Sequence, residues 1–151
     1  MNINTYLIFS GCCEEALQFY AQCLGGKISF LSRFRETPAA SSVAPEQLDK
    51  IIHASLQIGD TVLMASDGMD SKGQVAPSGF SLSINTETPE EAERIFALLA
   101  EGGKVTMPLT PTFWATRFGM LNDRFGTPWM VNCEGSGEKA APPDSTPASV
   151  K

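Results

Sequence analysis

The chain has 151 residues, of which 42% are hydrophobic and 19% charged, and its formal net charge at pH 7 is −6. This composition is typical of a soluble globular domain, and the negative charge argues against a nucleic-acid partner, which needs a basic stripe. No apolar run approaches the roughly 20 residues that span a bilayer, and the first residues do not resemble a signal peptide. We therefore expect a cytoplasmic protein with neither nucleic-acid nor membrane partners.

The cysteines are Cys12, Cys13, Cys23 and Cys133, and none of them forms a CxxC pair. Adjacent cysteines make an awkward disulfide framework, so a reduced cytosolic protein is the simpler interpretation. Cys12 lies near the start of a predicted helix, whose dipole would lower a thiol pKa. Because the sequence offers no evident base partner for this thiol, a structural role is favoured.

One stretch of the sequence occurs twice. EEALQFYAQCLGGKISF begins at Glu14, and the second copy, EEAERIFALLAEGGKVTM, begins at Glu90 and has one extra residue before its glycine pair. A later echo matches TVLMAS, from Thr61, with TPWMVN, from Thr127. Two copies are too few for a solenoid, so they predict two similar halves of one domain.

Hydrophobic periodicity predicts the same order of elements in both copies. Apolar residues at helical spacing predict helices at 13–24 and from Pro89 to the glycines at 102–103. Alternating apolar residues predict strands at 4–10, 27–36, 51–58 and 61–66 in the first copy and at 79–85, 105–109, 116–122 and 127–133 in the second. Each copy is therefore predicted to be β-α-β-β-β.

Several local signals refine these elements. Gly59-Asp60 predicts a hairpin turn, and Thr88 with Glu91 predicts a capping box. Alternation along the second strand places Ile28, Phe30 and Ser32 inward. A further set of segments is expected to be irregular: 37–50, a long loop with one helical turn; 67–78, a connection; and 135–151, a disordered tail.

The predicted fold class is α+β: two β-α-β-β-β modules, about 1–67 and 78–134, forming a single domain over residues 1–134. Each helix would cover the outer face of a curved mixed sheet. The concave face of such a sheet is a natural place for a small-molecule site.

Three segments carry a resemblance to a known family: YLIFSGCCEEALQFYAQCLGG near the start, HASLQIGDTVLMASD from His53, and TFWATRFGMLNDRFGTPWMVN from Thr112. In this order they resemble the vicinal oxygen chelate superfamily, which includes glyoxalase I, extradiol dioxygenases and bleomycin-resistance proteins, and within it the PhnB-like branch. The resemblance implies the glyoxalase/bleomycin resistance-type fold and a homodimer. Members of this branch are sometimes described as methyltransferases. We do not expect that activity here, because the sequence has no glycine loop that would hold S-adenosylmethionine.

The resemblance also implies where metal ligands would lie. Superfamily enzymes place four His or Glu ligands on the first strand and a later strand of each module. Those positions fall near Thr5 and Gly79, at Met130, and in the strand that contains His53. Because His53 is the only histidine and three or more ligands are needed, we expect no metal held in the standard way and no other cofactor.

His53 is the candidate catalytic residue. Alternation along the predicted strand places its side chain on the same face as Ser55 and Gln57. The resemblance places this strand against the ligand site. A neutral imidazole there would act as a base or as a hydrogen-bond partner of the ligand. The alternative is a structural histidine bonded to a neighbouring backbone group.

The other candidate ligand-binding residues are Phe113, Trp114, Arg117, Met64 and Met130. An indole beside a guanidinium suits a planar or anionic ligand, with Phe113 and Phe118 as apolar wall. The methionines would give a soft, adaptable wall. Core or dimer packing is the alternative for the aromatic and methionine side chains.

Charged residues outside this set have simpler interpretations. Arg33 and Arg35 either assist the site or face solvent. Asp67 and Asp70 are expected to face water, and Asp123 to cap a turn.

Two functions remain open at this point. The first is a small-molecule binding protein of the bleomycin-resistance kind, with a concave, partly apolar cavity and no metal. The second is an enzyme, a lyase or isomerase acting through His53, or a metalloenzyme with noncanonical ligands such as loop aspartates.

Overall fold

A computed structural model describes residues 1–68, 77–112 and 114–134. It divides the chain into two compact units, Met1–Val75 and Ala76–Lys151, which are described separately below. The boundary agrees with the two modules that the repeat predicts. The predicted tail at 135–151 lies outside the described residues, and a single domain spanning 1–134 stays a prediction. Of the helices that the structure describes, none is long and apolar enough to cross a membrane.

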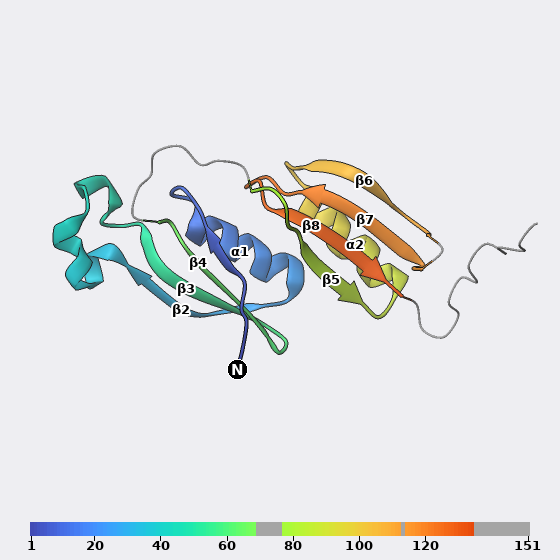
Figure 1. The fold of residues 1–151 in the computed structure, drawn as a ribbon, viewed down its shortest axis with the longest axis horizontal. Helices are drawn as coiled ribbons and strands as arrows, with labels where there is room; N and C mark the ends of the chain where they lie inside the picture. Colours follow the sequence, from blue (N-terminus) through green and yellow to red (C-terminus); the bar gives the residue numbers. More distant parts are fainter. Residues whose placement is uncertain (69–76, 113, 135–151) are drawn as a thin grey trace, which may run out of the picture. The chain divides into compact units, whose positions relative to one another are not determined.

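Unit 1 contains one helix and a four-stranded sheet (Figure 1). Its elements are β1 (Tyr6–Ile8), α1 (Cys13–Leu24), β2 (Lys27–Arg33), β3 (Ile51–Ile58) and β4 (Thr61–Ser66). The strand order is β1-β4-β3-β2, with β1 parallel to β4 and the other pairs antiparallel. The predicted helix and hairpin are confirmed. The expected loop at 37–50 contains two short 3-10 helices, Pro38–Ser42 and Pro45–Gln47, rather than one helical turn. A third, Phe34–Glu36, replaces the end of the strand predicted at 27–36.

Unit 2 repeats this architecture. Its elements are β5 (Leu82–Thr86), α2 (Pro89–Ala100), β6 (Lys104–Thr110), β7 (Arg117–Asn122) and β8 (Pro128–Cys133), in the strand order β5-β8-β7-β6. The Thr88 hydroxyl caps α2 by accepting a hydrogen bond from the Glu91 amide at 3.2 Å. The one displaced element is β5, which begins at Leu82 rather than at Gly79, where φ is 81°.

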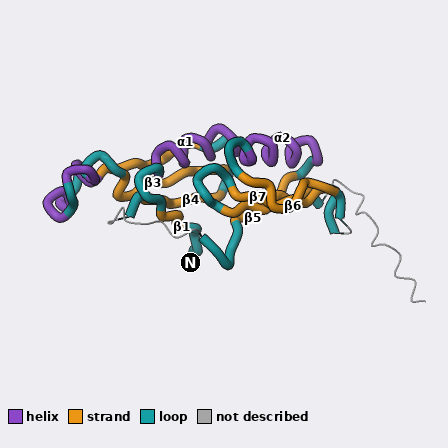
Figure 2. The backbone as a smooth tube through the Cα atoms, turned by 90° about the horizontal axis from the view of Figure 1, so that it is seen from above, coloured by secondary structure: helices purple, strands orange, loops and turns teal. Residues whose placement is uncertain are grey.

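In each unit the helix covers one face of its own sheet (Figure 2). The apolar stripe of α1 is fully buried, and α2 buries a matching stripe of four residues. The sheet residues that contribute to the same two cores include Leu7, Ala54, Leu56, Leu63 and Ala65 in unit 1 and Leu121, Trp129, Val131 and Cys133 in unit 2. Since strand residues alternate between faces, their neighbours along each strand lie on the face that the helix does not cover, which we call the open face.

The doubled GGK motif explains how each helix turns back into its sheet. The first glycines, Gly25 and Gly102, both adopt φ of 70°, a left-handed conformation in which glycine is favoured. The second glycines approach neighbouring backbone closely. A Cβ on Gly26 would lie 2.9 Å from the Gln57 carbonyl oxygen, and one on Gly103 would lie 2.3 Å from that of Asn122. The two glycines of each pair therefore have different physical requirements.

A β-bulge follows each GGK motif and corrects the prediction for Phe30. Ile28 pairs with the buried Leu56, but Phe30 pairs with Ser55, so Ser29 is an extra residue in the strand. One extra residue reverses the faces of all residues beyond it. Phe30 therefore lies on the open face, 53% exposed, and not inward.

The second copy repeats this bulge. Val105 pairs with the buried Leu121 and Met107 with Met120, which leaves Thr106 as the extra residue. Met107 thus reaches the open face of its own sheet, as Phe30 does in unit 1.

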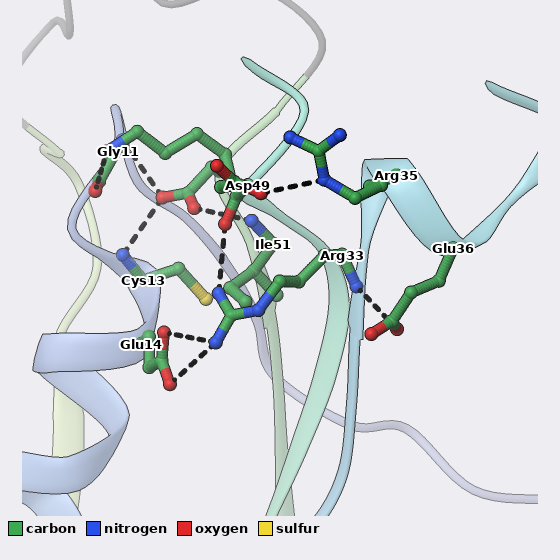
Figure 3. Close-up of polar contacts among 10 residues, drawn as sticks. Gly11, Cys13, Glu14, Arg33, Arg35, Glu36, Asp49 and Ile51 are labelled. Atoms are coloured by element: carbon green, nitrogen blue, oxygen red, sulfur yellow. Dashed lines mark hydrogen bonds and ion pairs between the residues drawn. The ribbon is translucent and has the colours of Figure 1, made fainter. Parts of the chain in front are cut away.

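Asp67 is the main polar junction of unit 1, which contradicts the expectation that it faces water. Only 2% of it is exposed, and it lies directly after β4. Its carboxylate accepts hydrogen bonds from the backbone N–H groups of Gly11 and Cys13, both at 2.9 Å, and of Ile51 at 2.8 Å (Figure 3). One carboxylate therefore joins the start of α1, the start of β3 and the end of β4, and it caps the positive end of the helix. Asp70 lies outside the described residues.

Arg33 and Arg35 are also structural (Figure 3). The Arg33 guanidinium donates to both carboxylate oxygens of Glu14, at 2.8 and 3.0 Å, and to the Asp49 carbonyl oxygen at 2.9 Å. Arg35 forms an ion pair with the Asp49 carboxylate at 3.0 Å. These contacts attach the segment between β2 and β3 at both of its ends and connect it to α1.

Replacing Asp67 with Asn should lower the free energy of unfolding by about 2–4 kcal/mol, because hydrogen bonds to a buried charge are lost and an amide N–H group is placed against backbone donors. The measurement is urea denaturation followed by circular dichroism. Asp60→Asn, at the exposed hairpin turn, is the matched control and should change stability by less than about 0.5 kcal/mol. Equal effects of the two substitutions would contradict the role assigned to Asp67.

Candidate functional site

The open face of unit 1 carries a row of side chains that crosses all four strands. In register, this row is Phe30 on β2, Ser55 on β3, Met64 on β4 and Tyr6 on β1. The ends of the row are apolar or aromatic and accessible: Phe30 is 53% exposed and Tyr6 43%, and Ile8, next on the same face, is 65% exposed. Met64 is half-buried between them. The register thus brings the predicted Met64 onto this face with two aromatic residues that were not predicted.

His53 lies on the same face and contacts both of these aromatic side chains. Its Nδ1 atom lies 3.1 Å from the hydroxyl of Tyr6, which reaches across β4 from β1. The imidazole stacks on the Tyr6 ring, with centroids 5.6 Å apart, and packs against Phe30 at 5.8 Å. His53 is therefore bonded to a tyrosine side chain, not to a neighbouring backbone group. Its other ring nitrogen, Nε2, has no hydrogen-bond partner in the described part of the chain.

This hydrogen bond links the chemistry of the two ring nitrogens. If Tyr6 donates to Nδ1, then Nε2 carries the proton and is a donor toward a ligand. If Nδ1–H donates to the phenol oxygen, then Nε2 is an acceptor and a base. The pair therefore provides a polar group that can serve in either sense, surrounded by apolar surface.

The open face of unit 2 carries two comparable rows. One consists of Met107, Met120, Met130 and Ser83, and the next of Thr110, Phe118, Asn132 and Asn85. Met130 thus lies at the position that Met64 occupies in unit 1, as the echo TVLMAS/TPWMVN predicts. Trp114 joins this face, since its ring packs edge-on against Phe118 with centroids 5.4 Å apart. Phe113 lies outside the described residues.

Arg117 does not belong to this face. It pairs in register with the fully buried Cys133, so it lies on the side of the sheet that α2 covers. There its Nε atom bonds to Glu93 of α2 at 3.1 Å, and Nη1 donates to the Thr116 carbonyl oxygen at 2.7 Å. Trp114 and Arg117 are thus close in sequence but do not form the predicted pair.

The residues at the family's metal positions do not fit the standard metal. Of these positions, Thr5 and Gly79 lie just before β1 and β5, Met130 lies on β8, and the remaining one lies on β3, the strand of His53. Thioethers and hydroxyls are poor ligands for the divalent ions that His and Glu hold. Within the described residues, no group of three or more His, Cys, Asp or Glu side chains lies close enough to hold a metal ion.

The thiol pKa of Cys12 shifts in the direction opposite to the predicted one. Its thiol pKa is raised, chiefly by burial and further by the negative charges of Asp67 and Glu15. The helix dipole does not prevail because the Asp67 carboxylate already occupies the N-terminus of α1. Burial, followed by Asp67, raises the pKa of Cys13 to about 12.

Several residues of the two open faces were missed by sequence reasoning: Tyr6, Phe30, Met107, Met120, Asn85 and Asn132. For Phe30 and Met107 a signal existed, because KISF and KVTM are equivalent in the repeat and share the bulge. For the others the required information is the pairing of strands, which sequence periodicity does not contain.

Comparison with known proteins agrees with this geometry. The family described as Glyoxalase/Bleomycin resistance protein/Dioxygenase superfamily matches residues 2–131, and the chain belongs to this superfamily. The expected fold class and the family resemblance are confirmed.

Three proteins in particular are similar to this chain over most of its length. The chain is 36% identical over 140 residues to Protein YjdN of Escherichia coli, which covers 87% of this chain and 95% of that protein. It is similar to the crystal structure of protein PA1353 from Pseudomonas aeruginosa, with 48% identity, 90% and 99% of the two chains covered, and a TM-score of 0.83. A Bacillus cereus structure described as a putative 3-demethylubiquinone-9 3-methyltransferase, PhnB protein, is 30% identical, with 88% and 99% covered and a TM-score of 0.74.

The raised pKa of Cys13 predicts a loss of stability at alkaline pH. The thiol pKa in an unfolded chain is near the ordinary value of 9.0, whereas in the folded protein it is about 12. The free energy of unfolding should therefore fall as pH rises through this window. Urea denaturation at several pH values measures the slope, and Cys13→Ala should make it shallower. Leu17→Ala, which only creates a cavity in the same core, should lower stability equally at every pH. An unchanged slope in Cys13→Ala would contradict the assignment.

Proposed function

We propose that this chain binds a small, partly apolar molecule on the open face of the unit 1 sheet, with the Tyr6–His53 pair as its polar contact and without the standard metal. The observation that carries the proposal is the 3.1 Å contact between the Tyr6 hydroxyl and His53 Nδ1, among accessible apolar side chains. Ligand sites in proteins combine an apolar lining with a few polar groups in this way.

The exposed apolar side chains give the energetic reason. Ile8 is 65% exposed and Phe30 53%, and removing such surface from water stabilises a complex by about 25 cal/mol per Å². The polar pair sets the orientation, because an imidazole nitrogen without a partner loses a hydrogen bond unless the ligand supplies one. Membership of a superfamily that includes bleomycin-resistance proteins supports binding as a function, and the donors at the metal positions support a mode without metal.

A second candidate function uses the same residues. A phenol that accepts from Nδ1–H would orient His53 so that Nε2 acts as a general base, as a lyase or isomerase requires. The contact between His53 Nδ1 and the Tyr6 hydroxyl oxygen favours this function, since the tautomer in which Nδ1–H donates leaves Nε2 free to accept a proton.

A homodimer, as the resemblance implies, is a further part of the proposal. Sedimentation over a wide range of protein concentrations tests it.

The test begins with a screen of small neutral aromatic and aliphatic compounds by NMR, with the ring protons of His53 and Tyr6 as reporters. For a compound that shifts them, Tyr6→Phe should weaken binding about fivefold to tenfold, because the ring remains and one hydrogen bond is lost. His53→Ala should weaken it further. Arg117→Gln is the control: its side chain lies on the face that α2 covers, so binding should be unchanged.

Two outcomes would overturn the proposal: no compound that shifts the His53 signals, or binding that Tyr6→Phe and His53→Ala leave unaltered. Analysis of the bound compound after incubation separates the two functions. Conversion by the wild type, lost in His53→Gln, would assign the enzyme, whereas recovery of the compound unchanged would assign the binding protein.

A further inference from the structure

A carboxylate lies at the edge of the unit 1 open face, close to His53. Glu36 is the last residue of the short 3-10 helix after β2, and its side chain is exposed. Its Oε2 atom accepts a hydrogen bond from the Arg33 backbone N–H group at 3.2 Å and lies 3.5 Å from the Ser32 hydroxyl (Figure 3). Ser32 is the cross-strand partner of His53, and the Cβ atoms of such partners are about 5 Å apart. One side chain therefore separates the Glu36 carboxylate from the imidazole.

The arginines on either side of Glu36 pair with other carboxylates. The Arg33 guanidinium lies 2.8 Å from Glu14, on the helix side of the sheet, and that of Arg35 lies 3.0 Å from Asp49 (Figure 3). None of the ion pairs among the described residues includes Glu36. Its negative charge is therefore available to a ligand at this corner of the open face.

Two accessible aromatic side chains flank the same imidazole. Phe30 lies two residues before Ser32 and is 53% exposed, and its ring centroid is 5.8 Å from that of His53. The Tyr6 ring is 43% exposed, with its centroid 5.6 Å from the imidazole. The face of an aromatic ring is electron-rich and attracts a cation within about 6 Å of its centroid. An alkylammonium group suits such rings because it combines a positive charge with apolar methyl surface.

The other charges near this face also favour a cation. Lys27 is on the same face of β2, but it lies at the far end of the strand, in register with Gln57. Ser55 and Met64, at the centre of the face, carry no charge. The net charge of the chain, −6, attracts a cation and repels an anion during the approach to the protein.

We propose that the Tyr6–His53 site takes an alkylammonium cation, that Glu36 selects its positive charge, and that Phe30 and Tyr6 contact its methyl groups. The Tyr6–His53 pair then bonds to a neutral polar group of the same ligand, such as a hydroxyl. This inference rests on the proposed function, because it names the ligand class of that site. Glu36 lies at none of the positions where the superfamily places its metal ligands, so its role is a property of this chain.

Three probes of similar shape separate the effect of charge from that of shape. Choline has a trimethylammonium group and a hydroxyl; 3,3-dimethylbutanol has carbon in place of the charged nitrogen; and 3,3-dimethylbutanoate carries a negative charge. NMR titrations of the full chain at one pH, which follow the ring protons of His53 and Tyr6, give a Kd for each probe. We expect choline to bind about tenfold more tightly than 3,3-dimethylbutanol, through the carboxylate and the two rings together. The anion should bind most weakly.

Glu36→Gln should weaken choline binding about threefold to fivefold and leave 3,3-dimethylbutanol unaffected, because only an exposed charge is removed. Glu15→Gln is the matched control: it makes the same change of net charge on α1, which covers the other face of the sheet, and should keep the wild-type ratio. Phe30→Leu should reduce the preference for choline, since apolar surface remains but the ring is lost. Glu36→Lys should reverse the order of choline and 3,3-dimethylbutanoate, a gain of binding that a misfolded variant would not show.

Three results would overturn the inference: equal affinity for choline and 3,3-dimethylbutanol, equal effects of Glu36→Gln and Glu15→Gln, or no response of the His53 signals to choline while other compounds shift them. In each case the proposed function is retained, because a ligand without a positive charge still binds at the Tyr6–His53 pair. If no compound of any charge shifts these signals, the proposed function is wrong and the inference is wrong with it.

Discussion

Each sheet in this protein has one helix to cover it, and a single helix buries only one face. Both α1 and α2 have 12 residues, and each lies on a four-stranded sheet of its own unit. The second face of each sheet therefore consists of residues that its own helix cannot bury. The bulge after each GGK motif adds to that face, because it turns Phe30 and Met107 away from the helix side. The faces on which His53, Met64, Met130 and Arg117 lie follow from this division.

Three charged side chains, on the helix side of a sheet or at the end of a strand, hold the elements together. Asp67 joins three segments through backbone N–H groups, Arg33 connects β2 to Glu14 of α1, and Arg117 connects β7 to Glu93 of α2. The open-face rows carry neutral polar groups instead: the Tyr6–His53 pair in unit 1, and Asn85 with Asn132 in unit 2. This separation supports the proposal that a largely apolar small molecule binds at the open face of unit 1.

The same division bears on how this chain relates to its superfamily. The scaffold is retained over residues 2–131, including the parallel pairing of the first and last strands in each unit. At the centre of those pairs stand Tyr6 with Met64 and Ser83 with Met130, side chains that serve packing and hydrogen bonding better than metal ligation. A fold of this kind carries many chemistries, so the choice among them rests on the side chains at these positions.

Local patterns in the sequence determined the repeat, both helices, their glycine ends, the β3–β4 hairpin and hence the fold class, because each depends on residues near one another in the chain. The parity that groups His53 with Ser55 and Gln57 on β3 is also local. What only the tertiary structure decided depends on partners far apart in sequence. The register with β3 turned Phe30 outward, three distant N–H groups buried Asp67, and pairing with Cys133 directed Arg117 to α2 rather than to Trp114. Strand pairing brings such residues together, and no periodicity records which strand lies beside which.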